Sequence, residues 1–249
     1  MAAVRTVTQK AIAIGALLLS AAAVPAQAQA PKMPSIGYGL KEPTTPEEIA
    51  AAKPNPQTPG FRIPLPPLDQ MDPAMREDFE SNAKRLKTPV PPTAALMLTP
   101  DIKASVGGVL RPVVQAGLPQ DLWELSVLMV ARAWDVQFEW WVHAPQALHE
   151  GIPAETVEAI RTGHMPTAFA NPGQDAAYHF LLELFRDHKV SDATYEKLRA
   201  IIGTQRVVAL TVLVGYYGID AVSFIAQNLP FRADVKPPLP VLARNFPAK

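Results

Sequence analysis

The stretch Ala131–His149, ARAWDVQFEWWVHAPQALH, concentrates aromatic and ionisable side chains. Glu139 and His143 stand four residues apart, and residues at that spacing lie on one face of a helix. Aromatic neighbours predict a partly dry site in which the pKa values of a carboxylate and an imidazole shift. Fifteen residues before Glu139, Glu124 lies in the apolar run LWELSVLMVARAW, which indicates a buried helix.

The rest of the chain also carries helical patterns and little β signal, so we expect an all-α helical bundle. Asp135 is the expected cap of the helix that ends at His149, with Pro145 a kink inside it. Pro112 is expected to kink or break another helix. The expected helices cover residues 45–52, 72–85, 99–116, 119–133, 135–149, 154–161, 174–188, 193–202 and 205–228.

Residues 1–28 have the pattern of a cleavable signal peptide. Arg5 and Lys10 precede an apolar run over residues 11–23, and a small-x-small site ends at Ala28. The apolar run is shorter than the roughly 20 residues of a transmembrane helix. We expect an exported, periplasmic protein with no membrane contact after cleavage, and an uncleaved anchor is the alternative.

Proline content divides the remaining chain. Residues 29–70 form a proline-rich arm, residues 71–230 a helical domain and residues 231–249 a second proline-rich tail. Proline fixes φ and lacks a donor, which predicts an extended arm. Its apolar side chains favour wrapping over a neighbouring surface, and a neighbouring subunit is the surface we favour.

Composition excludes several classes of function. The chain has no cysteine, which rules out disulfides, thiolate metal sites and redox thiols. Basic and acidic residues number 23 each, and no basic stripe is present, so a nucleic-acid partner is not expected. A small-molecule substrate is the expected partner.

Leu122–Gly151 resembles the carboxymuconolactone decarboxylase family of the alkylhydroperoxidase-D-like superfamily. The resemblance extends to Met97–Gly108, to Leu210–Asn228 with its Gly215-Tyr216-Tyr217, and over roughly residues 70–230. The residues that carry the central motif are Arg132, Trp134, Gln137, Glu139, Trp140, His143 and the closing Gly151-Ile152-Pro153.

Thiol members of that superfamily place two cysteines and a histidine at offsets of 12, 15 and 19 from a glutamate. Counted from Glu124, these positions hold Val136, Glu139 and His143 in this chain. Without the cysteines, thiol peroxidase chemistry is excluded, because a glutamate cannot pass through sulfenic acid and disulfide states.

The resemblance therefore implies the decarboxylase branch: an all-α fold that acts on a carboxylated lactone with no metal or organic cofactor. It also implies a homo-oligomer, a trimer or hexamer, with sites near subunit contacts. Family members in aromatic-compound degradation are usually cytoplasmic, so an exported member leaves the substrate open.

His143 is the strongest catalytic candidate, because an imidazole exchanges protons near neutral pH. Glu139 is either a base or the residue that orients His143. Glu124 either hydrogen-bonds His143 or pairs with Arg132, since a buried lone carboxylate is costly. Arg132 is also a candidate to bind a substrate carboxylate through two hydrogen bonds.

Three further residues are candidates for substrate binding. Gln137 could donate to a carbonyl group, Trp140 could stack on a planar ligand, and the Tyr216 hydroxyl could donate to a developing enolate. Trp140 has an alternative role as a core residue.

Three functions remain open from the sequence. The first is a cofactor-independent acid/base lyase, decarboxylase-like, for a small carboxylated cyclic or aromatic-derived compound. The second is a non-catalytic exported binding or assembly protein on the same fold. The third is a metal-dependent hydrolase or oxygenase that uses the stripe of Asp135, Glu139 and His143.

Overall fold

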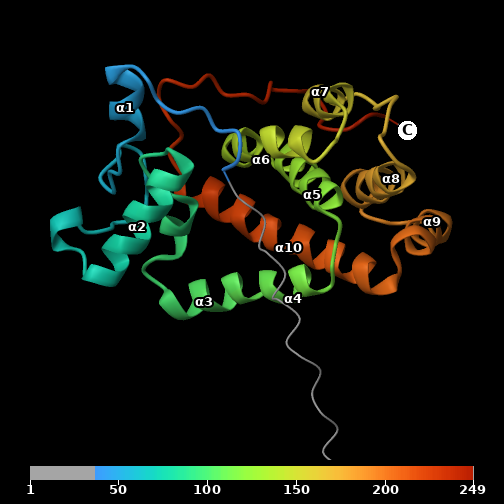
Figure 1. Cartoon of the computed structure of the whole chain (residues 1–249), viewed down its shortest axis with the longest axis horizontal. Coiled ribbons are helices and arrows are strands. Elements are labelled where there is room, and N and C mark those ends of the chain that lie inside the picture. The colour runs from blue at the N-terminus through green and yellow to red at the C-terminus, as the bar shows by residue number, and fades with distance from the viewer. Residues whose placement is uncertain (1–36, 249) are drawn as a thin grey trace, which may run out of the picture. The chain divides into compact units, whose positions relative to one another are not determined.

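The computed structural model describes residues 37–248, which form helices joined by loops and contain no β-strand (Figure 1). The all-α fold expected from the sequence is confirmed for these residues. The predicted signal peptide lies outside them. The α-helices are α1 (Pro46–Ala52), α2 (Pro73–Leu86), α3 (Pro100–Gly108), α4 (Leu110–Gln115), α5 (Gln120–Ala133), α6 (Gln137–His149), α7 (Ala154–Thr162), α8 (Pro172–Asp187), α9 (Asp192–Ile202) and α10 (Thr204–Gln227), with 3-10 turns η1 (Leu68–Gln70) and η2 (Pro92–Leu96).

Most helix ends lie within two residues of their predicted positions, and two features differ more. Asp135 does not cap α6; Val136 does, and Asp135 has a left-handed backbone with φ of 54° and pairs with Arg132. The helix expected over residues 99–116 ends and restarts at Val109, ahead of Pro112. Proline is tolerated in the first turn of a helix, where its missing N–H has no partner to lose, so α4 accommodates Pro112.

The core is built around α5. Every residue from Leu122 to Arg132 is buried, because α5 packs against α6, α8 and α10 as well as α7. A helix surrounded in this way is apolar on nearly all sides, which explains the apolar run LWELSVLMVARAW in the sequence. The two polar exceptions with long side chains, Glu124 and Arg132, therefore require specific partners.

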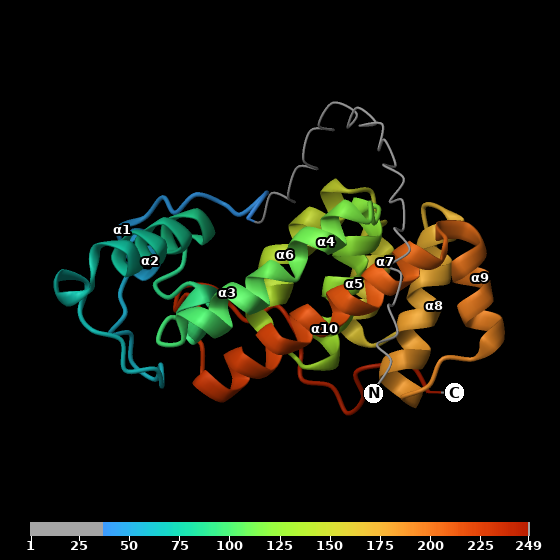
Figure 2. The ribbon, with the colours of Figure 1, turned by 90° about the horizontal axis from the view of Figure 1, so that it is seen from below.

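Helix α10 packs on α5 along one side and on α4 along another, and in Figures 1 and 2 it runs past both. By length and composition alone, α10 could cross a membrane. The core helices of soluble proteins can meet the same two criteria. The outer side of α10 remains exposed at Val208, Ile219, Val222 and Ile225.

The described part of the proline-rich arm packs on its own chain. A second hydrophobic cluster joins Leu65 of the arm to Phe79 and Ala83 of α2. The arm also meets the end of α10, where the Arg62 backbone N–H donates to the Gln227 carbonyl (3.0 Å). The arm thus wraps a surface, as expected, and from Gly37 onward the surface described is that of the same subunit.

The C-terminal tail crosses α5, α6 and α7. The Phe231 ring packs edge-on against Trp141, with centroids 5.2 Å apart, and Phe246 stacks on Phe185 of α8 at 5.9 Å. Backbone carbonyls of the tail also accept hydrogen bonds from side chains of the helices, including Arg161 on α7. The proline-rich tail is therefore fixed by aromatic contacts and by polar side chains from helices.

Candidate active site

The facing surfaces of α5 and α6 bring three ionisable side chains together. Nδ1 of His143 lies 2.8 Å from Oε2 of Glu124, and Nε2 lies 3.3 Å from Oε2 of Glu139. The three residues are 1–4% exposed. The structure thus brings together the three side chains that the sequence singled out, with the imidazole between two carboxylates.

Both carboxylates favour the charged form of the imidazole. Burial alone lowers the pKa of His143, but the charges and hydrogen bonds of Glu124 and Glu139 outweigh burial and raise it to about 10. His143 is therefore an imidazolium at neutral pH. The second oxygen of Glu124, Oε1, accepts a hydrogen bond from Gln120 at 3.0 Å, so neither oxygen of this buried carboxylate lacks a partner.

An aromatic side chain from α10 closes one side of this group. The edge-to-face contact between the Tyr217 ring and His143 has a centroid distance of 5.2 Å and an interplanar angle of 87°. The Trp123 indole N–H donates to the Tyr217 hydroxyl at 3.4 Å. Burial, together with the charges of Glu139 and Glu124, raises the pKa of Tyr217 well above its usual value, so the phenol stays neutral.

A cavity of about 180 Å³ adjoins this group. Glu139 and His143 line the cavity, whereas Glu124 holds the imidazole from behind. An apolar cavity of about 150 Å³ can hold a benzene ring, so this volume suits a small cyclic compound. Its lining residues are Arg85, Leu86, Pro92, Thr93, Leu96, Lys103, Val106, Gly107, Phe138, Glu139, Val142, His143, Tyr216, Tyr217 and Asp220.

The cavity wall carries polar groups suited to an anionic ligand. Arg85 of α2 and Lys103 of α3 supply positive charge, and Lys103 also pairs with Asp78 at 2.5 Å. The Thr93 hydroxyl is buried and has no hydrogen-bond partner within residues 37–248. A buried polar atom without a partner is uncommon in proteins, and a ligand in the cavity could satisfy this one.

Sequence reasoning missed Asp220, which lines the cavity beside Glu139 and His143. Burial and the charge of Glu139 raise its pKa well above the ordinary value, and His143 opposes this shift. One signal was present in the sequence: Asp220 is the only charged residue between Arg206 and the end of α10. A lone acid in an apolar helix marks a position that packing does not explain.

Three of the predicted substrate-binding residues lie outside the cavity lining. The buried Arg132 guanidinium pairs with Asp135 and donates to the carbonyls of Arg161 (2.9 Å) and Pro240 (3.2 Å). It is not the partner of Glu124, so the alternative Glu124–Arg132 pair does not form. Arg132 instead fixes the tail, because its charge needs partners in the interior.

Gln137 and Trp140 also have structural positions. The Gln137 amide exchanges two hydrogen bonds with the backbone of Leu239 in the tail, at 2.7 and 3.1 Å. Trp140 is buried in the main core. Of the four predicted substrate-binding residues, Tyr216 alone lines the cavity.

The metal alternative loses one of its ligands in this geometry, because Asp135 pairs with Arg132. Within residues 37–248, no group of three or more histidine, cysteine, aspartate or glutamate side chains has an arrangement that could hold a metal ion.

Comparisons of the chain with protein-family models, with curated proteins and with solved structures found no match.

Proposed function

We propose that the protein is a cofactor-independent acid/base lyase, decarboxylase-like, that acts on a small carboxylated cyclic or aromatic-derived compound. The observation that carries this proposal is the buried series Glu124–His143–Glu139, which ends at a cavity of suitable size. Ionisable groups with perturbed pKa values in a cavity are typical of acid/base catalysis.

His143 is the acid of the proposed site, because it carries a proton on each ring nitrogen at neutral pH. In the proposed step, the bond between the carboxyl group and the ring carbon of the substrate breaks. The carboxyl group leaves as CO₂, and the electron pair passes into a neighbouring carbonyl group to give an enolate. The Nε2 proton of His143 then adds to the ring carbon, and water returns a proton to the imidazole.

The two glutamates have different roles in this proposal. Glu124, behind the imidazole, fixes the ring and keeps it charged. Glu139 lines the cavity, and its carboxylate lies 3.3 Å from Nε2 of His143, a longer contact than that of Glu124. A substrate atom can therefore take the place of Glu139 as the partner of Nε2. Arg85 and Lys103 take the carboxylate-binding role that the sequence had suggested for Arg132, since they line the cavity and Arg132 does not.

The test is a screen of carboxylated lactones and aromatic acids for release of CO₂, followed by mass spectrometry. His143→Gln removes the proton that the proposed step transfers, and we expect turnover to fall about 100-fold or more, the range for loss of a proton-transfer group. His164→Gln, at an exposed position outside the cavity lining, is the control. Equal turnover by His143→Gln and the parent protein would exclude this assignment.

A non-catalytic binding or assembly protein is the second candidate, and the exposed apolar side of α10 favours it. It predicts that one of the screened compounds binds without any change in mass. A metal-dependent hydrolase is separated from both by elemental analysis: it requires stoichiometric metal whose removal by a chelator abolishes turnover.

We also propose that the chain is exported, on the basis of the signal-peptide pattern of residues 1–28. Expression of the full chain in a Gram-negative host should give a periplasmic protein whose N-terminal sequence begins at Gln29. A protein that retains residues 1–28 and fractionates with the membrane would instead indicate an uncleaved anchor.

A further inference from the structure

The cavity contains an acidic residue that the mechanism above does not use. Asp220 of α10 lines the cavity with Glu139 and His143 of α6. Tyr216 precedes Asp220 by four residues, so the two side chains share one face of α10, and both line the cavity. This face of α10 thus presents a phenol and a carboxyl group to the same cavity as His143 and Glu139.

Burial and the nearby Glu139 oppose a negative charge on Asp220. The ionisable groups that line the cavity with it are Glu139 and His143 on α6, Tyr216 and Tyr217 on α10, Arg85 on α2 and Lys103 on α3. Within residues 37–248, Asp220 makes no hydrogen bond or ion pair. Burial and the neighbouring Glu139 raise the pKa of Asp220 well above its ordinary range, and His143 opposes this shift.

A protonated carboxyl group has one O–H to donate, and Asp220 has no acceptor for it within residues 37–248. The Tyr216 phenol is also neutral, because burial raises its pKa. Two neutral O–H donors on one wall of a cavity suit an oxygen that gains negative charge during a reaction. A protonated carboxyl group paired with a tyrosine is a known arrangement for stabilising an enolate.

We propose that Asp220 is a further catalytic residue, which, with Tyr216, donates a hydrogen bond to the substrate oxygen on which negative charge develops. The inference rests on the proposed function and narrows its substrate class to compounds with a carbonyl oxygen conjugated to the bond that breaks. In this step the electron pair of the broken carbon–carbon bond moves onto that oxygen. Asp220 keeps its proton throughout, and the proton that adds to carbon comes from His143.

The first test is binding of 4-nitrophenol, whose phenolate oxygen resembles the enolate oxygen and whose absorbance reports ionisation. The full protein should bind the phenolate. Asp220→Ala should weaken binding about 10- to 100-fold, the worth of one hydrogen bond to a charged group. Asp220→Asn keeps an N–H donor and should stay within a few-fold of the parent. The control, Asp69→Asn, changes an exposed aspartate outside the cavity and should have no effect.

Three results would overturn the inference: no phenolate binding by the parent protein, equal binding by Asp220→Ala, or an Asp220→Asn variant as weak as Asp220→Ala. Thermal unfolding followed by circular dichroism identifies a variant that has failed to fold. If the variants fail to fold, infrared difference spectroscopy of the parent protein is the test, because a protonated carboxyl group has a carbonyl band at neutral pH. A band that shifts when the phenol binds would support the inference. The absence of this band would overturn the inference.

These tests are independent of turnover. Phenolate binding that depends on Asp220, together with no CO₂ release from any screened compound, would contradict the proposed lyase. It would still support Asp220 and Tyr216 as hydrogen-bond donors in the cavity. CO₂ release that Asp220→Ala leaves unchanged would contradict the role of Asp220 and leave the lyase standing.

Discussion

At the scale of single residues, the burial of His143 between two carboxylates makes it a structural group as well as a chemical one. His143→Ala would leave Glu124 and Glu139 buried without their common partner. Removing one member of a buried ion pair costs about 3–5 kcal/mol. We expect a loss of this size in the free energy of unfolding, measured with urea at pH 7. His164→Ala, at an exposed position, should change it by less than about 0.5 kcal/mol.

The pKa of His143 also predicts how stability varies with pH. In the unfolded chain the imidazole has a pKa of about 6.5, and in the folded protein of about 10. The contribution of His143 is therefore fully present below about pH 6.5 and is lost as the pH rises toward 10. Urea unfolding at pH 6, 8 and 9.5 should show this decline. Glu124→Gln should make this decline less steep, because the carboxylate that raises the pKa of His143 most is gone. An unchanged slope would contradict the assignment.

The same residues show how far the sequence leads. The spacing of Glu139 and His143, together with the apolar run around Glu124, was enough to predict that three side chains converge. Asp220 was missed because it meets the others through packing of α10 against η2 and α5, which no local pattern records. Arg132 and Gln137 were assigned to a ligand because the tail that they bind lies about 100 residues further along the chain.

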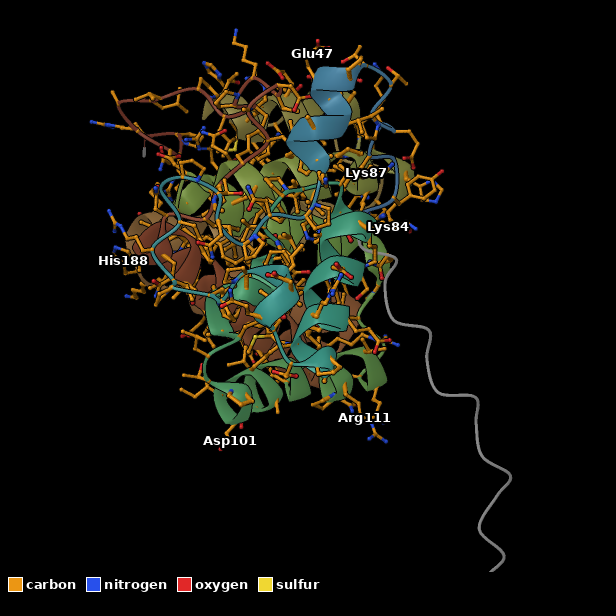
Figure 3. The ribbon with its side chains drawn as sticks, turned by 90° about the vertical axis from the view of Figure 1, so that its left-hand side faces the viewer. Glu47, Lys84, Lys87, Asp101, Arg111 and His188 are labelled. Carbon is orange, nitrogen blue, oxygen red and sulfur yellow. The ribbon has the colours of Figure 1, made fainter. Side chains whose placement is uncertain are left out.

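At the scale of helices, the C-terminal end of α8 is a position where one substitution should stabilise the protein. The residue after α8 is His188, with φ of 51°, a left-handed conformation in which glycine has no steric penalty. His188 is exposed, lies at the edge of the molecule in Figure 3, and makes no side-chain hydrogen bond within residues 37–248. His188→Gly should therefore raise the free energy of unfolding by about 0.5–1 kcal/mol, measured with urea. His188→Ala, which keeps the Cβ atom, is the control and should give no gain.

Most helix boundaries were predictable from caps and prolines, since these act within a few residues. Ser191 caps α9 through a side-chain oxygen that accepts from the backbone, and α9 begins one residue before its predicted start. Asn171 caps α8 in the same way, but this cap was missed, and α8 begins two residues before its predicted start. The turn between α5 and α6 was predicted wrongly, because an acidic residue before a helix is typical of a cap. Here the charge of Arg132 draws Asp135 into a left-handed conformation instead.

At the scale of the whole molecule, the outer side of α10 is the place to look for the homo-oligomer that the resemblance implies. Val208, Val212, Ile219 and Val222 are exposed at spacings of three, four and seven residues, the pattern of a helix that pairs with another helix. We propose that a second copy of this chain covers this side. Val212→Glu should lower the molar mass measured by light scattering to that of one chain and leave the circular dichroism spectrum unchanged. Val241→Glu, the same change at an exposed position in the tail, is the matched control. An unchanged mass for Val212→Glu would place the subunit contact elsewhere.

The hydrogen bonds between Arg132 and the tail have a consequence for folding during synthesis. The acceptors of Arg132 include the carbonyl of Pro240 and the side chain of Asn245, 108 and 113 residues later in the chain. While the polypeptide is synthesised, α5 emerges long before these acceptors. During that interval the guanidinium can pair with Asp135 and then with the Arg161 carbonyl, but it lacks the acceptors of the tail, so early closure of the core is less favourable. The chain is thereby biased to stay open until residues 240–245 have emerged.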